Sequence, residues 1–228
     1  DVIGFQIGDL VACAGAGIAN HAEIIDVPVN LTVAIPENLS TELASTVTLG
    51  AIAMQGIRRT KPTLGDTVVI IGLGILGQLT AQLLKLNGCR VIGIDIDPKR
   101  IQMALDRGLD YGISPLNEDI VDQVHKLSHN FGADAVLITA ASKNNAIVSD
   151  AMKMCRKKGR VVLVGDVGLD LNREDFYKKE LDFLISTSYG PGRYDPVYEI
   201  EGQDYPIAYV RWTENRNMEE YIRLLAEK

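Results

Sequence analysis

The chain has 228 residues, 46% of them hydrophobic and 23% charged, which is the composition of a folded globular protein and not of a disordered one. Its formal net charge of −7 would repel a phosphate backbone, so we expect no nucleic-acid partner. Its apolar runs are far shorter than the roughly 20 residues that cross a bilayer, so we expect no membrane segment.

The start of the chain predicts a small β region followed by a helix. Gly, Asn and Pro separate short apolar stretches there, which is typical of the remnant of a mainly β domain. The expected strands are 10–13, 22–27 and 31–35. Ser40 is expected to cap a helix that continues to Arg59.

Beyond Pro62 the pattern changes to strands and helices in alternation. The strands are almost continuously apolar, as in parallel sheets that are covered on both faces. Six strands with right-handed crossovers predict an α/β protein with the Rossmann fold, a doubly wound six-stranded parallel sheet. The expected strands are 67–71, 90–94, 111–113, 135–138, 160–164 and 183–188, and the helices are 75–86, 98–107, 120–128 and 145–156. The last helix is expected to end with Gly159 as its left-handed cap.

The end of the chain breaks this pattern. Between Gly190 and Asn217 there is no periodicity, which predicts an ordered functional loop or an interface segment before a closing amphipathic helix at 218–226. Because the chain starts at Asp1 and shows no terminating signal after Lys228, we expect the natural polypeptide to extend further. The expected domains are a β remnant, a Rossmann dinucleotide-binding domain, and a loop with its closing helix, at 1–45, 46–189 and 190–228.

A glycine-rich turn joins the first strand of the sheet to its helix, in the order Gly72-Leu73-Gly74-Ile75-Leu76-Gly77. Gly72 permits the tight turn, Gly74 lets a pyrophosphate approach the backbone, and Gly77 lets the helix pack on the strand. The free amides of Ile75 and Leu76, with the helix dipole, would hold the phosphates. A GxGxxG motif alone is weak evidence, but here it lies between a strand and a helix, as dinucleotide binding requires.

The second strand of the sheet ends at Asp95, about 20 residues after Gly74, where dinucleotide-binding proteins carry a ribose-binding acid. A carboxylate there accepts hydrogen bonds from the ribose hydroxyls and repels a 2′-phosphate, which favours NAD over NADP. Asp95 as a mere helix cap is the weaker interpretation. Lys99 and Arg100 reduce the exclusion of NADP, because either could meet a phosphate, and Arg100 is a candidate cofactor contact.

Two later strand ends add Thr139 and Gly165 as cofactor-binding candidates, because ligands bind at the carboxyl edge of such sheets and small side chains leave room. No catalytic residue or proton donor is identified. The cysteines form no Cys-x-x-Cys pair and the histidines form no zincin motif, so no metal site is predicted. We interpret the cysteines as reduced residues of a cytoplasmic protein.

Further short motifs occur in a fixed order along the chain. They are Gly8-Asp9-Leu10-Val11, Ala22-Glu23, Ile35-Pro36, Gly65-Asp66-Thr67, Gly132-Ala133-Asp134 and Gly159-Arg160-Val161-Val162-Leu163-Val164-Gly165. Together with the glycine turn they resemble the medium-chain dehydrogenase/reductase family, which contains zinc-type alcohol dehydrogenases and zinc-free quinone reductases. The resemblance implies that the N-terminal strands are a partial GroES-like β remnant. It also implies that Thr48 lies close to the nicotinamide. The one zinc-ligand position left would be Val47 or Thr48, and because neither binds zinc well, a zinc-free enzyme is favoured.

Three other segments look like a narrower group, the bacterial two-domain oxidoreductases in which this module precedes a Gfo/Idh/MocA-type dehydrogenase. They are Ala12-Cys13-Ala14-Gly15-Ala16-Gly17, Met154-Cys155-Arg156-Lys157-Lys158-Gly159 and Tyr189-Gly190-Pro191-Gly192-Arg193-Tyr194. This resemblance implies a sugar or nucleotide sugar as the small-molecule substrate. A homodimer and a covalently linked second dehydrogenase domain are partner arrangements that it leaves open.

The resulting hypothesis is an NAD(H)-binding oxidoreductase module that transfers hydride between nicotinamide and an alcohol or carbonyl carbon. We expect the fragment alone to have no turnover. Three alternatives remain open: a non-catalytic nucleotide-sensing Rossmann domain, a zinc-free quinone-reductase-like enzyme, and a methyltransferase, which also has a glycine-rich loop and an acid at the second strand.

Overall fold

The computed structural model describes residues 2 and 4–227, which belong to two compact units. One unit is Gly56–Ser186, and the other combines Asp1–Gln55 with Thr187–Lys228. Helix α2 (Val47–Thr60) contributes to both, because the division falls between Gln55 and Gly56. The expected domain boundaries at 1–45, 46–189 and 190–228 remain a prediction.

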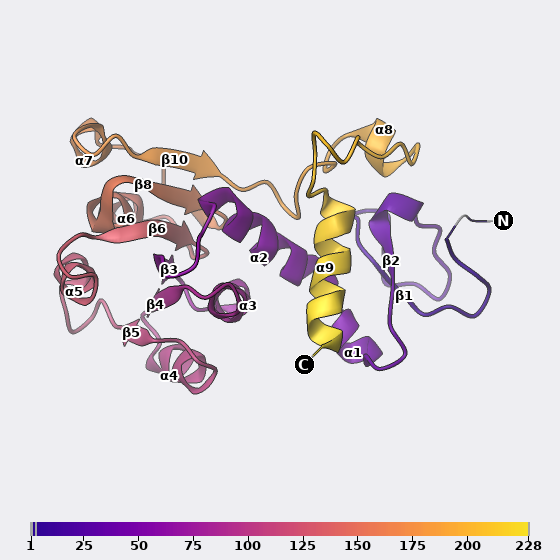
Figure 1. Cartoon of the computed structure of the whole chain (residues 1–228), viewed down its shortest axis with the longest axis horizontal. Coiled ribbons are helices and arrows are strands. Elements are labelled where there is room, and N and C mark those ends of the chain that lie inside the picture. The colour runs from indigo at the N-terminus through magenta and orange to yellow at the C-terminus, as the bar shows by residue number, and fades with distance from the viewer. Residues whose placement is uncertain (1, 3, 228) are drawn as a thin grey trace. The chain divides into compact units, whose positions relative to one another are not determined.

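The 56–186 unit is built on a six-stranded sheet in the order β10-β8-β6-β3-β4-β5, with every neighbouring pair parallel (Figure 1). This confirms the α/β Rossmann fold. The strands are β3 (Thr67–Ile71), β4 (Arg90–Ile94), β5 (Tyr111–Ile113), β6 (Ala133–Ile138), β8 (Cys155–Leu163) and β10 (Asp182–Ile185). The chain leaves β3 towards β4 on one side and later returns to β6 on the other, so β3 and β6 flank the switch point where such sheets bind ligands.

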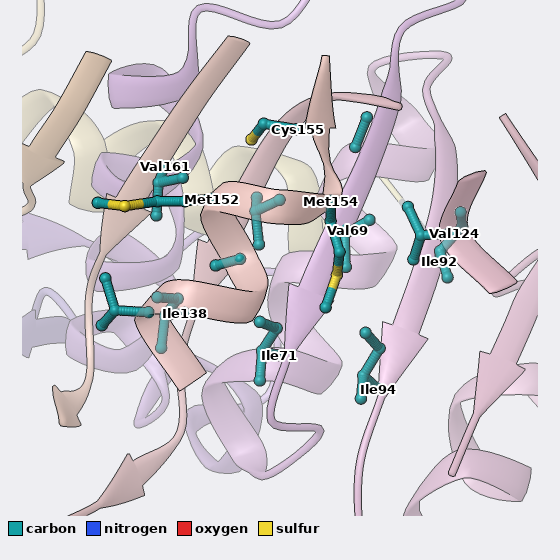
Figure 2. Close-up of a cluster of buried hydrophobic side chains, with 14 of the residues drawn as sticks. Val69, Ile71, Ile92, Ile94, Val124, Ile138, Met152, Met154, Cys155 and Val161 are labelled. Carbon is teal, nitrogen blue, oxygen red and sulfur yellow. The ribbon is translucent and has the colours of Figure 1, made fainter. Parts of the chain in front are cut away.

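Helices cover both faces of this sheet (Figure 1). One face carries α3 (Ile75–Leu86) and α4 (Pro98–Asp106), and the other carries α5 (Ile120–Leu127) and α6 (Ala146–Met154). Strand side chains alternate between two apolar cores. Val69 and Ile71 pack on the α5–α6 side (Figure 2), while Val68 and Ile70 pack on the other side. Burial on both faces explains why these strands are apolar throughout.

The expected end of the fourth helix, with Gly159 as its cap, is wrong. Helix α6 ends at Met154, and the basic run 156–158 already belongs to strand β8. The positive φ falls on Lys158, at 59°. The helix ends early because of a tertiary contact: Arg156 forms an ion pair with Asp134, with 2.6 Å between the guanidinium Nε and the carboxylate. The ammonium of Lys179 instead caps α6, donating to the carbonyls of residues 152, 153 and 155 at 3.2, 2.6 and 2.7 Å.

Short elements complete this unit: β7 (Ala141–Ser142) pairs with β9 (Asp166–Val167), and α7 is Arg173–Tyr177.

The second unit contains much less regular structure. Its only sheet among the described residues is the antiparallel pair β1 (Val11–Cys13) and β2 (Thr32–Ala34). A 3-10 turn, η1 (Val29–Leu31), comes directly before β2. The expected strand at 22–27 is wrong: those residues form bends and irregular chain, with Ile24 91% exposed. Without a partner strand or a core to cover, an apolar run has no reason to extend.

The expected helix from Ser40 to Arg59 is divided into α1 (Thr41–Ala44) and α2. Ser40 caps α1 as predicted, accepting a hydrogen bond from the amide of Leu43 at 3.3 Å. The break follows because the hydroxyls of Ser45 and Thr46 bond back to nearby carbonyls, each at 2.6 Å, and compete with the helical pattern.

The 190–217 segment is ordered. It contains α8 (Pro196–Glu199), and a buried ion pair joins Arg193 to Glu199 at 2.6 Å. The closing helix α9 (Glu214–Ala226) starts before the expected Met218, because Thr213 accepts a hydrogen bond from a first-turn amide. Across the described part of the chain, no helix is long and apolar enough to cross a membrane.

Candidate functional site

A cavity of about 510 Å³ opens at the carboxyl ends of β3, β4 and β6, within the 56–186 unit. The ends of these strands and the starts of α5 and α6 supply its walls. The lining residues are Ile71, Gly72, Gly74, Ile94, Asp95, Ile96, Arg100, Pro115, Ile120, Thr139, Ala140, Ala141, Ser142, Asn144, Ile147 and Asp150. Its position is the switch point that the strand order defines.

The glycine turn forms one wall of this cavity, and two of its glycines are required by packing. Gly72 has a φ of +97°, and a Cβ there would lie 2.7 Å from the backbone nitrogen of Ala140. A Cβ on Gly77 would lie 1.9 Å from the carbonyl oxygen of Gly72. These positions accept only glycine, because backbone atoms occupy the space that a side chain needs.

Gly74 is different, because a Cβ there would meet nothing within 4 Å. Its backbone faces open cavity, and no side chain caps the helix that it starts. Hydrogen bonding within α3 begins with Gln78, whose amide donates to the Gly74 carbonyl at 2.9 Å, so Ile75 and Leu76 carry first-turn amides without a helical acceptor. A bare helix N-terminus beside open space is suited to an anion that approaches the backbone closely.

Asp95 lies at the end of β4 and is 7% exposed. One carboxylate oxygen accepts from the amide of Leu73 at 2.6 Å, and the other accepts from the amide of Asp97 at 2.8 Å. The guanidinium of Arg100 lies 3.9 Å from the first oxygen. Each carboxylate oxygen can accept a second hydrogen bond, so Asp95 is fixed in place with acceptor capacity directed at the cavity.

Thr139 lines the cavity just after β6, and Gly165 lies behind that wall. The hydroxyl of Thr139 donates to the Gly72 carbonyl at 2.6 Å, which ties the end of β6 to the glycine turn. Gly165 does not line the cavity; a Cβ there would lie 2.1 Å from the carbonyl oxygen of Ala140. Its effect on the site is therefore to let the ends of β8 and β6 approach each other.

The structure brings Gly72, Gly74, Asp95, Arg100 and Thr139 together around one cavity. Gly77 and Gly165 lie behind its walls, and Ile75 and Leu76 belong to the helix start beside it. The other predicted residue, Thr48, belongs to the other compact unit, and its place near a nicotinamide remains a prediction.

The sequence reasoning missed several lining residues, above all Pro115, Ile120, Ile147 and Asp150. The apolar ones come from loops and helix starts after β5 and β6, and such positions carry no motif. Asp150 lies on α6, facing the cavity one turn after Ile147, and burial raises its pKa above the usual range of a carboxyl group.

Comparison with known proteins identifies the family. Residues 76–200 match the family described as zinc-binding dehydrogenase. The chain belongs to the zinc-binding dehydrogenase family. This confirms the resemblance to the zinc-type, medium-chain alcohol dehydrogenases.

Individual members of the zinc-binding dehydrogenase family agree with this assignment. A sorbitol dehydrogenase of Halalkalibacterium halodurans is 32% identical over 155 residues, covering 66% of this chain and 45% of that protein. A D-guloside 3-dehydrogenase of Escherichia coli is 32% identical over 142 residues, covering 61% and 40%. This chain therefore spans less than half the length of the curated relatives it matches.

Solved structures give the same fold. A putative zinc-binding dehydrogenase from Sinorhizobium meliloti 1021, bound to NADP, superposes with a TM-score of 0.69 at 20% identity, covering 86% of this chain and 52% of that one. At this identity the likeness concerns the fold alone.

Zinc, which the family description implies, can be assigned a site here only where the described residues form a cluster of ligands. A zinc ion takes four ligands from Cys, His, Asp or Glu, at least three of them supplied by protein even in catalytic sites. Residues 2 and 4–227 contain no group of three or more such side chains that could hold a metal ion. We therefore assign no zinc ligand to these residues.

A dinucleotide fits the cavity on three observations. Gly74 leaves open space where a pyrophosphate would approach, α3 offers uncapped amides, and Asp95 presents a fixed carboxylate. The described residues of this zinc-binding dehydrogenase chain thus fit a nucleotide cofactor.

Proposed function

We propose that this chain binds NAD(H) and positions it for hydride transfer between the nicotinamide and an alcohol or carbonyl carbon of a sugar or nucleotide sugar. The observation that carries the proposal is the pairing, in one cavity, of the open backbone at Gly74 with the fixed carboxylate of Asp95. When bound, the cofactor supplies the hydride carrier at its nicotinamide ring.

The roles of the residues follow from their positions. The amides at the start of α3, at Ile75 and Leu76, bind the pyrophosphate, with Gly74 allowing close approach. Asp95 accepts hydrogen bonds from the hydroxyls of the adenosine ribose and disfavours a 2′-phosphate, which is why we propose NAD rather than NADP. Arg100, 54% exposed in its side chain, lies beside that ribose position and weakens the discrimination.

The remaining proposals concern the whole protein. We propose a cytoplasmic enzyme with the domain division 1–45, 46–189 and 190–228, in which Thr48 lies close to the nicotinamide. Its partners would be the small-molecule substrate, a second copy of the chain, and a covalently linked Gfo/Idh/MocA-type dehydrogenase domain. The names of the sorbitol and D-guloside dehydrogenases support a polyol or sugar substrate.

The test is a titration of the purified chain with NADH and with NADPH, followed by nicotinamide fluorescence. We expect tighter binding of NADH. Asp95→Ala should weaken NADH binding about tenfold, because a charged hydrogen bond contributes about 1.5 kcal/mol or more, and should reduce the preference over NADPH. Asp95→Asn keeps the volume of the side chain and one of its two acceptor oxygens, and it should act in the same direction.

Asp106→Asn is the matched control, because Asp106 lies on neighbouring α4 and does not line the cavity. It should leave both affinities unchanged. Binding of neither dinucleotide to the folded chain contradicts the proposed function. An unchanged NADH to NADPH ratio in both Asp95 variants contradicts the role given to Asp95.

A further inference from the structure

One acidic side chain of the cavity has no role in the function proposed above. Asp150 lines the cavity from helix α6, one turn beyond Ile147, and is only partly exposed. Asp95, the other acidic group of the lining, accepts two backbone amides. Within the described residues, no hydrogen bond or ion pair engages the carboxylate of Asp150.

The charges around Asp150 do not compensate for the lack of a hydrogen-bond or ion-pair partner. Burial raises the pKa of its carboxyl group, Lys153 on the same helix acts in the opposite direction, and Asp119 and Asp175 raise the pKa further. A partly buried acceptor with unused lone pairs gains from a ligand that brings a hydrogen-bond donor. A negatively charged ligand group would be repelled instead.

The surroundings of Asp150 restrict the shape of such a ligand. Ile96, Pro115, Ile120 and Ile147 line the same cavity as Asp150 and give it a largely apolar character. An apolar slot with one acceptor matches a flat aromatic ring that carries an amino group. The adenine of a dinucleotide has that chemistry, and its 6-amino group donates hydrogen bonds.

We propose that Asp150 accepts a hydrogen bond from the 6-amino group of the cofactor's adenine ring and thereby selects adenine over hypoxanthine. This inference rests on the proposed binding of NAD(H). In hypoxanthine a carbonyl oxygen replaces the amino group, so two acceptors would face each other at Asp150. The discrimination is therefore a loss of one hydrogen bond together with an added repulsion.

The experiment compares the binding of NADH with that of reduced nicotinamide hypoxanthine dinucleotide, whose base carries a carbonyl oxygen in place of the 6-amino group and a proton on the neighbouring N1. Both are titrated into the purified chain and into Asp150→Ala, Asp150→Asn and Asp106→Asn. Asp106 is the control: it is an exposed acid on helix α4, it does not line the cavity, and it does not act on the carboxyl group of Asp150.

We expect the parent chain to bind NADH about tenfold more tightly than the hypoxanthine analogue, since hydrogen bonds to charged groups have this strength. In Asp150→Ala the ratio should fall to about one, mainly through weaker NADH binding. In Asp150→Asn the amide can donate to the hypoxanthine oxygen, so the ratio should fall through tighter binding of the analogue. Asp106→Asn should keep the parental ratio.

The outcomes separate this inference from the proposed function. If the parent chain binds both dinucleotides equally, or if both Asp150 variants keep the parental ratio, the role of Asp150 is overturned while NADH binding stands. If the parent chain binds neither, the proposed function fails first. Because Asp150→Asn conserves volume, it decides the question even if Asp150→Ala folds poorly.

Discussion

Two buried carboxylates, one in each compact unit, are treated in opposite ways by their surroundings. Asp95 in the 56–186 unit is 7% exposed and accepts two backbone amides. Glu214 in the other unit is fully buried, and neither of its oxygens has a hydrogen-bond partner in the described structure. Burial, and then the nearby Glu199, raise the pKa of Glu214 to about 8, against the opposing effect of Arg193.

The difference shows what a built binding site requires. Around the glycine turn, the Asp95 carboxylate, the Thr139 hydroxyl and the Gly72 amide each have a hydrogen-bond partner, so the backbone there is held in one conformation. Around Glu214, the structure tolerates an acid that must stay protonated to remain buried. The stability of the glycine-turn region should therefore depend on side-chain size, and the stability of the Glu214 region on pH.

The largest effect is expected from Gly77→Ala, which introduces a steric clash into the glycine turn. The new Cβ would lie 1.9 Å from the Gly72 carbonyl oxygen, so the turn must move. We expect a loss of about 3 kcal/mol in the free energy of unfolding, a drop of about 10 °C in Tm, and loss of NADH binding. Differential scanning calorimetry and the NADH titration measure these changes.

Gly74→Ala is the matched control, because its Cβ would meet nothing within 4 Å. It should keep the parental Tm and lose only affinity for NADH. A Gly77→Ala protein with parental stability would show that the turn can relax.

An intermediate effect is expected from Glu214→Gln, which removes the buried ionisable group. The unfolded carboxyl group ionises near its ordinary pKa of 4.5, whereas the folded one stays protonated up to about pH 8. The unfolded state therefore binds fewer protons within this window, and stability falls as pH rises, by up to about 1.4 kcal/mol per pH unit. At pH 9 the variant should melt up to about 10 °C above the parent, whereas at pH 4.5 the two should agree.

Thermal denaturation at pH values between 4.5 and 9 checks this expectation. Glu201→Gln is the control, since Glu201 is an exposed acid in the same segment. Parallel pH profiles for the parent and Glu214→Gln would mean that Glu214 ionises in the folded protein without cost.

The smallest effect is expected from Thr139→Val, which removes the hydroxyl that donates to the Gly72 carbonyl at 2.6 Å. We expect a loss of about 1 kcal/mol, or about 3 °C in Tm, with a modest decrease in NADH affinity. Thr139→Ser keeps the hydroxyl and should recover most of both. Equal losses in the two variants would assign the effect to packing instead of the hydrogen bond.

The parts of this molecule that could be predicted are those fixed by local chemistry. Strands β3, β4 and β5 have the expected bounds, because apolar runs between turn residues define them. The glycine turn and Asp95 were predictable because phosphate approach and ribose binding fix the spacing of those residues. These signals are found within one strand–helix–strand segment of the chain.

The parts that could not be predicted depend on distant residues. Arg156 leaves its helix because Asp134 on another strand binds it, and the 22–27 run stays irregular because no strand pairs with it. Asp150 and Glu214 look like ordinary helix acids in the sequence, and only the folded chain shows what surrounds them. Burial without a partner is a property of the packing, and no local pattern encodes it.

The hydrogen bond from Thr139 to the glycine turn has a kinetic consequence for the proposed cofactor. Together with the bond from the Gly72 amide to the Ile94 carbonyl, at 2.8 Å, it sets the turn into its final conformation before any ligand arrives. Such preorganisation removes the entropic cost of ordering a loop upon binding. Variants that remove either of these two hydrogen bonds should therefore raise the dissociation rate of the dinucleotide much more than they lower its association rate.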